Sequence, residues 1–143
     1  MKIFYLLLTL LVVTHAQSLK DIKFDDMSVE KVTSIYDGDT FRANIKGYPK
    51  IIGYRIPIRV NGIDTPELRA KCTKEKQLAR FAKQITVNLL RNANKIELKN
   101  VKRGKYFRII ADVYVDGKLL SDKLLEKGVA VKYSGGTKID WCK

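Results

Sequence analysis

Apolar and polar residues alternate along the first part of the chain with the two-residue period of β-strands. The alternation covers residues 29–35, 40–45 and 51–63 and is rich in β-branched side chains. Asp37-Gly38 and the segment Gly47-Tyr48-Pro49 interrupt it with turn-forming residues, and Gly38 provides a position that accepts a positive φ. We therefore predict three strands in this region.

The period changes to that of a helix between residues 73 and 91. Apolar residues recur there at intervals of three and four, while lysines and arginines occupy other positions, which predicts an amphipathic helix with a basic, exposed side. The apolar positions are Leu78, Phe81, Ala82, Ile85, Leu89 and Leu90.

Shorter elements are predicted after this helix. Residues 95–101 and 108–115 return to strand character, and Asp116-Gly117 predicts another turn. A short helix follows, with Ser121 as the expected N-cap and Gly128 as its C-terminal stop. Residues 129–133 are the candidate for a last short strand.

This order of elements predicts an α+β protein, a small closed or nearly closed β-barrel with packed helices. The oligonucleotide-binding (OB) barrel is the commonest small fold of this kind. The 143 residues are enough for one domain with a real core, which we place at residues 29–143. Residues 17–28 show no clear period and are interpreted as a lead-in.

The N-terminal residues have the features of an export signal. Lys2 precedes an apolar run at residues 3–13, and the small residues Thr14 and Ala16 follow it. This run is much shorter than the roughly 20 residues that a membrane-spanning helix needs. We predict a signal peptide at residues 1–16 and a secreted or periplasmic protein, with no stable membrane insertion after cleavage. An uncleaved membrane tether is the alternative.

The charge of the chain is strongly positive. There are 28 Lys and Arg against 15 Asp and Glu, a net charge of +13, and loss of residues 1–16 would leave +12. Such a charge favours nucleic acid, anionic lipid or acidic glycans as partners, although it also serves simple solubility. The same cleavage would remove His15, the single histidine. Nuclease and protease mechanisms that depend on an imidazole are therefore excluded.

Cys72 and Cys142 are predicted to form one disulfide, since a cysteine pair in an oxidising compartment usually does. The bond would tie the C-terminal residues 140–143 to the body of the domain. Two free thiols, or a thiol nucleophile, are the alternative, but no base for such a nucleophile is evident.

A carboxylate at Asp39 is unexpected directly after the Asp37-Gly38 turn, because Asp is a poor strand residue and needs a partner when half-buried. A second carboxylate cluster, Asp64 and Glu67, lies in "GIDTPEL", where Pro66 predicts a turn at a strand end. If the barrel closes, Asp39, Asp64 and a turn carbonyl form a set of hard oxygen ligands that suits Ca²⁺ and not zinc. Each half alone is also typical of a plain turn or a capping box.

Two arginines strengthen the hypothesis of a phosphate site. Arg59 lies five residues before Asp64, and Arg108 begins a later strand. Guanidinium groups stabilise the extra negative charge that a phosphodiester acquires during hydrolysis, and Glu67 could deprotonate a water. Taken singly, each arginine is better explained as a solvent-exposed residue at a strand edge in a chain already rich in Arg and Lys.

The motifs "DGDTF", "R-x4-DTPE" and "KYxR" occur in this chain in the order and spacing of staphylococcal-nuclease-like proteins, the thermonucleases. The chain resembles this family over residues 29–133. The resemblance implies a five-stranded OB-fold-type β-barrel with packed helices and a single Ca²⁺. It also implies hydrolysis of DNA and RNA with little regard to the sugar, leaving 3′-phosphate ends.

The resemblance further assigns roles by motif position. It implies metal binding by the side chains of Asp39 and Asp64 and by the carbonyl of Thr65. It implies water activation by Glu67 and phosphate binding by Arg59 and Arg108. Contact with a terminal phosphate of the bound nucleotide is implied for Lys105 and Tyr106.

The chain departs from the family pattern at three places. Gly104 and Phe107 replace the usual residues around the "KYxR" motif. The stretch after Glu67 is short and contains Cys72, and no second stacking tyrosine lies near Tyr133. These differences bear on pocket shape and nucleotide preference, while the implied catalytic set is intact.

Three other functions are compatible with parts of the sequence. A non-catalytic nucleic-acid-binding module would use the same barrel, but it has no need of the retained acids and arginines. Glu97-x-Lys99 occurs in another type of metal-dependent nuclease, but it is frequent on exposed strands. A cationic surface-binding protein would leave the carboxylates and arginines unexplained. We expect a monomer that acts on DNA and RNA.

Overall fold

A computed structural model describes residue 22 and residues 24–143 of the chain. The predicted signal peptide at residues 1–16 and half of the predicted lead-in, residues 17–21 and 23, lie outside the described residues. Of the lead-in, Phe24 forms an isolated antiparallel bridge with Val101, and the first strand begins at Met27. The sheet therefore starts two residues before the predicted boundary at residue 29.

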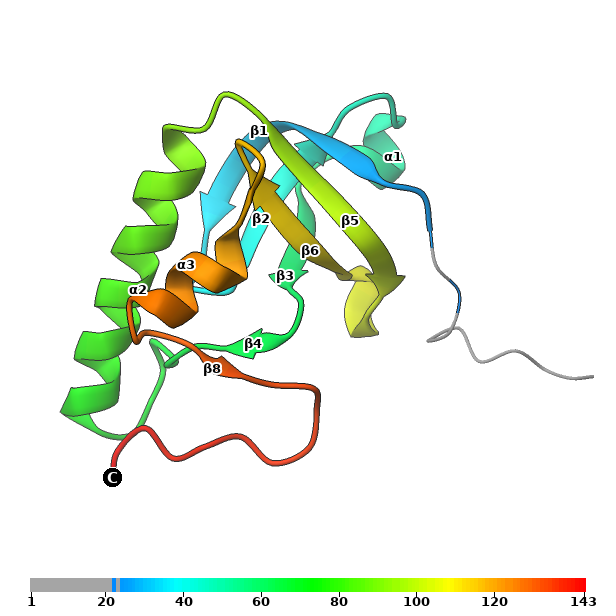
Figure 1. Ribbon diagram of the computed structural model, residues 1–143. Coiled ribbons are helices and arrows are strands. Elements are labelled where there is room, and N and C mark those ends of the chain that lie inside the picture. The colour runs from blue at the N-terminus through cyan, green and yellow to red at the C-terminus, as the bar shows by residue number, and fades with distance from the viewer. Residues whose placement is uncertain (1–21, 23) are drawn as a thin grey trace, which may run out of the picture.

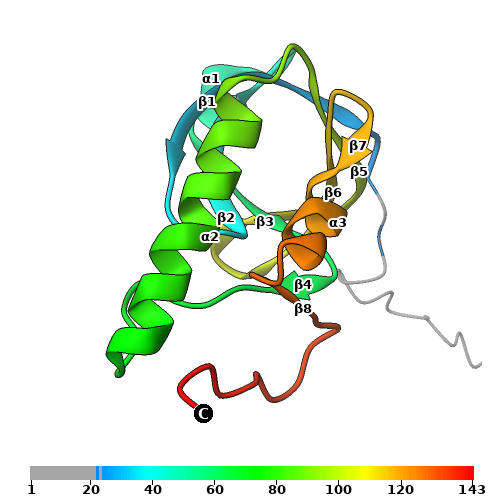
Figure 2. The same cartoon turned by 60° about the vertical axis from the view of Figure 1, so that its left-hand side comes forward.

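Five strands close into a mixed β-barrel, as the sequence predicted (Figures 1 and 2). They are β1 (Met27–Ile35), β2 (Thr40–Ile45), β3 (Ile56–Val60), β5 (Ile96–Arg103) and β6 (Ile109–Val115). Antiparallel pairing runs in the order β3-β2-β1-β5-β6, and parallel pairing of β3 with β6 completes the ring. Because a closed barrel has no free edge, the strand ends are brought together at its two mouths.

Shorter elements extend the barrel. They are β4 (Ile63–Asp64), the 3₁₀ turn η1 (Lys105–Phe107), β7 (Lys118–Leu119) and β8 (Val131–Lys132). β4 pairs with β8 in a separate two-stranded sheet, which lies below the barrel in Figure 1. The last predicted strand is therefore present, and it lies beside the predicted turn that contains Asp64.

Three helices accompany the strands: α1 (Lys50–Gly53), α2 (Thr73–Arg91) and α3 (Leu120–Glu126). α2 has the predicted bounds and lies along one side of the barrel (Figure 1). It buries Ala79, Ala82, Thr86 and Leu90. Phe81, which was predicted for the packed face, is 55% exposed, because the buried positions near it are taken by small residues.

Residues 51–55 were wrongly predicted as part of a strand. Pro49 precedes a single helical turn in which the amides of Ile52 and Gly53 donate to its carbonyl, at 3.0 and 2.8 Å. Arg55 then adopts a left-handed conformation with φ 52°, so extended structure starts only at Ile56. The apolar run 51–52 satisfied a strand pattern, but Pro49 favours the first turn of a helix.

The short helix α3 begins one residue before Ser121, so the prediction of Ser121 as N-cap was wrong. The N-cap is Leu119, and it makes no side-chain cap hydrogen bond. Gly128 ends the helix as predicted, with φ 68°. Its amide donates to the carbonyl of Leu125 at 3.0 Å.

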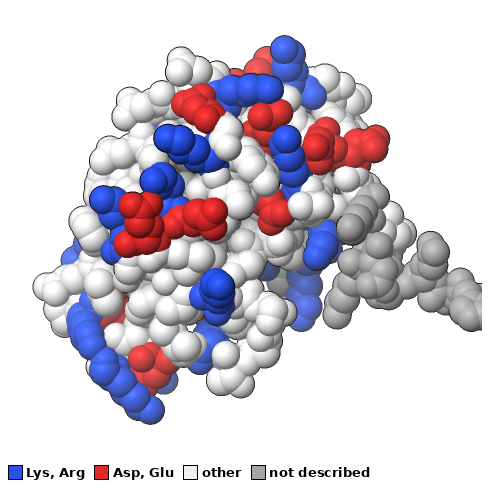
Figure 3. All heavy atoms as spheres, in the orientation of Figure 1, with Lys and Arg blue, Asp and Glu red and all other residues white. Residues whose placement is uncertain are grey.

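The core fills the barrel and the space beneath α2. Its largest fully buried side chains come from β2, β3, β4, β5 and α3, and they are Phe41, Ile58, Ile63, Leu98, Leu120 and Leu124. The charged side chains lie mostly outside this core, and on the face seen in Figure 3 acidic and basic groups are interspersed. Among the described residues, no helix is both long and apolar enough to cross a membrane.

Candidate functional site

The turn between β1 and β2 carries Asp37, Gly38 and Asp39. The Asp37 Oδ1 accepts a hydrogen bond from the Asp39 amide at 3.2 Å. The Asp39 carbonyl accepts from the amide of Val60 at 2.8 Å, which fixes the turn against the end of β3. The side chains of Asp37 and Asp39 are buried, so this segment is more than a surface turn.

Gly38 is required at this turn by close packing and not by a positive φ, which corrects the expectation from its sequence. A Cβ atom there would lie 2.9 Å from Cγ2 of Thr65 and 3.0 Å from Cβ of Ala82. The Gly38 carbonyl accepts a hydrogen bond from the buried Thr86 hydroxyl of α2 at 2.7 Å. Helix α2 and the turn after β4 therefore meet at this glycine.

The carboxylate of Asp39 has about four acceptor sites, and three of them are already in use, which leaves about one for a ligand. Its Oδ1 accepts from the Thr40 hydroxyl at 2.8 Å and from Nη1 of Arg59 at 3.0 Å. Its Oδ2 accepts from the Thr65 amide at 3.2 Å. This last bond joins the β1–β2 turn directly to the segment after β4, as the predicted convergence of the two carboxylate clusters requires.

Arg59 bridges the two carboxylates. While its Nη1 contacts Asp39, its Nη2 donates to Oδ1 of Asp64 at 2.9 Å. The Arg59 side chain is 16% exposed and both carboxylates are 2% exposed. One largely buried guanidinium thus holds two buried carboxylates. The planar fork of N–H donors on a guanidinium fits the acceptor oxygens of carboxylates.

Burial changes the protonation of the two acids in the turn. Desolvation, with a contribution from the neighbouring Asp39 charge, raises the pKa of Asp37 to about 7. Desolvation also raises the pKa of Asp39, although Arg59 and the Thr40 hydroxyl oppose the shift. Crowded, buried carboxylates of this kind bind a cation readily, because a cation relieves their repulsion.

Glu67 lies beside the buried pair on an exposed turn. Its side chain is 55% exposed, and its backbone amide donates to Oε1 of Glu75 in α2 at 3.1 Å. Its carboxylate is joined to Asp64 by a shared partner, the Nζ of Lys138, which is 3.0 Å from Oδ1 of Asp64. Of the predicted residues, the structure therefore gathers Asp39, Asp64, Thr65, Arg59 and Glu67.

Arg108 lies on the same face of the barrel as Arg59. The parallel register places Arg59 opposite Ile110, and Arg108 is two extended residues before Ile110. Its Nε is buried and has no hydrogen-bond partner, and no ion pair within residues 24–143 involves it. Arg108 is thus near Arg59 in register but is not joined to the carboxylates.

Lys105 and Tyr106 are exposed on η1, immediately before Arg108. The Tyr106 side chain is 94% exposed. Tyr106 and Phe107 both have left-handed backbone conformations, with φ 56° and 62°. A left-handed backbone favours glycine, so Phe107 occupies a strained position, and its ring packs under the guanidinium of Arg103 at 4.0 Å.

Sequence reasoning missed two members of this cluster, Asp37 and Lys138. Asp37 was interpreted only as a turn residue, although two acids flanking one glycine could have indicated a shared site. Lys138 is one of many lysines and gave no signal. Partial burial opposes its charge, but hydrogen bonds to Glu67 and Asp64 keep the pKa of Lys138 above its ordinary value.

The predicted disulfide is present. Cys72, the N-cap residue of α2, is bonded to Cys142 across a sequence separation of 70 residues. The bond ties the C-terminal segment, which passes beneath β4 and β8 in Figure 2, to the beginning of α2.

The donor set fits a hard cation. Asp39, Asp64 and the Thr65 carbonyl offer oxygen ligands only, which suits Ca²⁺ and Mg²⁺ better than zinc. The Thr65 Oγ1 is buried and has no hydrogen-bond partner, and Oδ2 of Asp64 accepts no hydrogen bond from the described residues. The buried Thr65 Oγ1 and the Oδ2 of Asp64, both unpaired among the described residues, are atoms that a ligand or its waters would satisfy.

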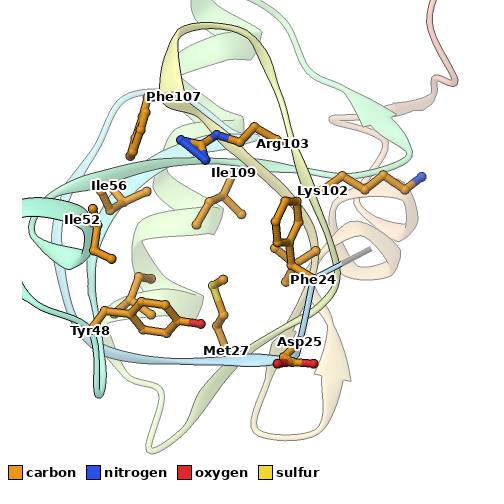
Figure 4. Close-up of a pocket in the computed structure, with 12 residues that line it drawn as sticks. Phe24, Asp25, Met27, Tyr48, Ile52, Ile56, Lys102, Arg103, Phe107 and Ile109 are labelled. Carbon is orange, nitrogen blue, oxygen red and sulfur yellow. The ribbon is translucent and has the colours of Figure 1, made fainter. Parts of the chain in front are cut away.

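A separate hollow opens at one end of the barrel (Figure 4). It has a volume of about 260 Å³ and a largely apolar lining that includes Phe24, Met27, Tyr48, Ile56 and Phe107. None of the predicted site residues lines it. The carboxylate cluster is therefore distinct from this apolar cavity.

Comparisons with known proteins agree with the motifs. A family model described as "Staphylococcal nuclease homologue" matches residues 57–140. The chain is 33% identical over 97 residues to the SPbeta prophage-derived endonuclease YokF of Bacillus subtilis (strain 168), covering 66% of this chain and 30% of that protein. It is 32% identical over 97 residues to Endonuclease YncB of the same strain, covering 66% and 43%. It is 28% identical over 129 residues to the Probable endonuclease lcl3 of Pyrenophora tritici-repentis (strain Pt-1C-BFP), covering 75% and 47%.

The chain spans less than half the length of each of these relatives. The family match, in contrast, covers more than half of this chain and contains Arg59, Asp64, Glu67 and Arg108. The closed five-stranded barrel is the fold that the motifs implied. On the strength of this match, the chain belongs to the staphylococcal nuclease family.

Proposed function

We propose that this protein is an exported, Ca²⁺-dependent nuclease that hydrolyses phosphodiester bonds of DNA and RNA with little sugar specificity and leaves 3′-phosphate ends. The observation that carries the proposal is the bridge of Arg59 between the buried Asp39 and Asp64. Membership of the family and the names of the relatives, all endonucleases, support the same function.

Asp39, Asp64 and the Thr65 carbonyl are the groups that would hold the cation. Bound Ca²⁺ supplies positive charge that stabilises the negative charge developing on the phosphate oxygens. Asp39 and Asp64 are buried, so little water competes for their carboxylate oxygens, and the attraction between these oxygens and a cation is stronger than in solvent.

Arg59 and Arg108 would bind the phosphate. Negative charge accumulates on the equatorial oxygens of phosphorus during hydrolysis, and guanidinium groups bind such oxygens with paired hydrogen bonds. Arg108 has its Nε unpaired in the absence of substrate and shares a barrel face with Arg59. It therefore has donor capacity that a phosphate can use. Lys105 and Tyr106, exposed on the adjacent η1, would contact a neighbouring phosphate of the substrate.

Glu67 would act as the general base. As the water oxygen bonds to phosphorus, Glu67 accepts the proton of that water. The bond from phosphorus to the 5′-oxygen breaks and the departing oxygen takes a proton from solvent, which leaves a 3′-phosphate on one product and a 5′-hydroxyl on the other. The side chain of Glu67 is exposed enough to reach solvent, while Glu75 holds its backbone. General-base assistance of this kind contributes about 10²–10⁴ in rate.

The site of action that we propose is beyond the inner membrane, in the periplasm or the medium, with the protein acting as a monomer. The disulfide supports the proposed compartment, because such bonds persist in oxidising compartments.

The proposal is tested by digestion of plasmid and single-stranded DNA and RNA with Ca²⁺, Mg²⁺ or a chelator. We expect cleavage with Ca²⁺ that the chelator abolishes. Glu67→Gln should lower the rate by about 10²–10⁴ and Arg108→Ala by about 10³ or more. Arg80→Ala, on the exposed side of α2, is the matched control and should leave the rate unchanged.

Products labelled at their ends should carry 3′-phosphates. Tight nucleic-acid binding without any cleavage would support a binding module instead. If Glu67→Gln and Arg108→Ala cut as fast as the wild type, the roles given to these residues are wrong.

A further inference from the structure

Lys138 occupies a position between two carboxylates of the candidate site. Its Nζ is 3.0 Å from Oδ1 of Asp64 and also contacts Oε1 of Glu67. Asp64 is buried, so this ammonium group neutralises a charge that water does not reach. Lys138 therefore occupies space and charge that a cation bound to Asp64 would need.

The segment that carries Lys138, residues 134–143, is attached to the body of the protein at both ends. At its start, β8 pairs with β4, and the Tyr133 amide donates to the Gly62 carbonyl at 2.9 Å. Gly135 and Gly136 then reverse the chain, with φ 111° and 88°. At its far end, Cys142 is bonded to Cys72. We call residues 134–143 the tail (Figure 1).

Lys138 and Arg59 contact the same oxygen, Oδ1 of Asp64, but they differ in freedom. Arg59 is on a barrel strand, is 16% exposed and holds two carboxylates at once. Lys138 is 40% exposed and belongs to an irregular segment. An ammonium group and a divalent cation at one carboxylate repel each other, so binding of the cation favours departure of the less firmly held group. Lys138 is the group that is free to move.

We propose that Lys138 is a built-in counter-ion which Ca²⁺ displaces from Asp64 and Glu67, and that the disulfide-held tail keeps it there. Because Ca²⁺ has to break the two contacts of Lys138 before it binds, the free energy of these contacts is subtracted from that of Ca²⁺ binding. The disulfide strengthens this competition, because attachment at both ends keeps the local concentration of the ammonium group high. The inference rests on the proposed Ca²⁺ site.

The test measures Ca²⁺ binding by titration calorimetry on the full chain at fixed pH and ionic strength. Lys138→Met keeps most of the side-chain length and removes the charge. It should tighten Ca²⁺ binding roughly three- to tenfold, the range expected for two partly exposed ionic contacts, one of them to a buried carboxylate. Lys132→Met, on β8, removes the same charge from a lysine without an ion pair among the described residues. It should change the affinity by less than about twofold.

Reduction of the disulfide provides the second arm. With a thiol reductant, and reduction verified by counting free thiols, the wild type should bind Ca²⁺ more tightly and approach Lys138→Met. Lys138→Met itself should not respond to reduction.

The outcomes separate this inference from the proposed function. If the wild type binds Ca²⁺ and cleaves nucleic acid, but Lys138→Met binds with equal or lower affinity, the counter-ion role is wrong and the proposed function stands. A response to reduction that is equal in the wild type and in Lys138→Met would exclude the role of the tail. If the wild type binds no Ca²⁺, the cation site and this inference fall together.

Discussion

Three buried carboxylates, Asp37, Asp39 and Asp64, lie close to a single buried guanidinium, that of Arg59. Asp39 and Asp64 are ion-paired, whereas Asp37 makes no ion pair among the described residues and is influenced by backbone donors, the Arg59 charge and the repulsion of Asp39. Of the three carboxylates, Asp37 is therefore the one whose negative charge the fold stabilises least.

This imbalance predicts a pH dependence. The folded pKa of Asp37 is about 7, against an ordinary value of 3.8, so between these values the folded protein holds a proton that the unfolded chain has lost. The stability contribution of Asp37 is full below about pH 4 and is lost as the pH rises to about 7. Asp37→Asn removes this loss and keeps an acceptor for the Asp39 amide. With a chelator present, it should raise the free energy of unfolding at pH 8 by at least about 1 kcal/mol.

Urea unfolding at pH 8 and pH 4.5 provides the measurement. The gain from Asp37→Asn should shrink at the lower pH. A gain of the same size at both values would show that Asp37 is not protonated in the fold near neutral pH.

Single residues differed in how far the sequence revealed them. Asp39, Asp64 and Arg59 were predicted to converge because each stands at a strand end or turn, where barrel closure limits the possible neighbours. Lys138 could not be predicted, since its position depends on the path of a segment without periodic pattern. Its partners, Asp64 and Glu67, lie 74 and 71 residues earlier.

At the scale of elements, α2 and the β1–β2 turn form one packed unit around Gly38. The contacts run from Ala82 and Thr86 on the helix to the turn, and from the turn to Thr65. The long helix was predictable because nineteen residues hold a consistent period. The single turn of α1 was not, because four residues are too few to separate a helical from a strand pattern.

Gly38→Ala tests this unit. Its Cβ would approach Thr65 Cγ2 and Ala82 Cβ to about 3 Å, so backbone or helix has to shift. We expect a loss of about 1–3 kcal/mol in the free energy of unfolding, together with weaker Ca²⁺ binding because the Thr65 carbonyl moves. The measurements are denaturant unfolding and calorimetry.

A second substitution shows whether the cause is the predicted clash. Thr65→Ser deletes Cγ2 and keeps the carbonyl, so Gly38→Ala combined with Thr65→Ser should recover part of the lost stability. If Gly38→Ala is as stable as the wild type, the turn accommodates a Cβ atom at residue 38 and the predicted clash with Thr65 and Ala82 is wrong.

At the scale of the whole molecule, the sequence carries a net charge of +13, and on the face seen in Figure 3 basic and acidic side chains are interspersed. The net positive charge should attract nucleic acid whatever its sequence, while Arg59, Arg108 and Lys105 determine where it is bound.

Salt dependence distinguishes these two contributions. For Glu67→Gln in the presence of a chelator, affinity for single-stranded DNA should fall linearly in a log–log plot against salt concentration. Lys105→Met should reduce the slope by about one. Lys118→Met, at the opposite end of β6 from η1, should leave the slope unchanged. Equal effects of both variants would show that Lys105 makes no specific phosphate contact.

The guanidinium of Arg59 also bears on how the protein matures. Since Asp39 and Asp64 already have an internal partner, the chain can complete its barrel before any metal arrives, unlike small zinc domains that stay unfolded until loaded. Under the proposed Ca²⁺ dependence, assembly of the barrel and activation are then separate events, because the cation binds to a fold that is already complete.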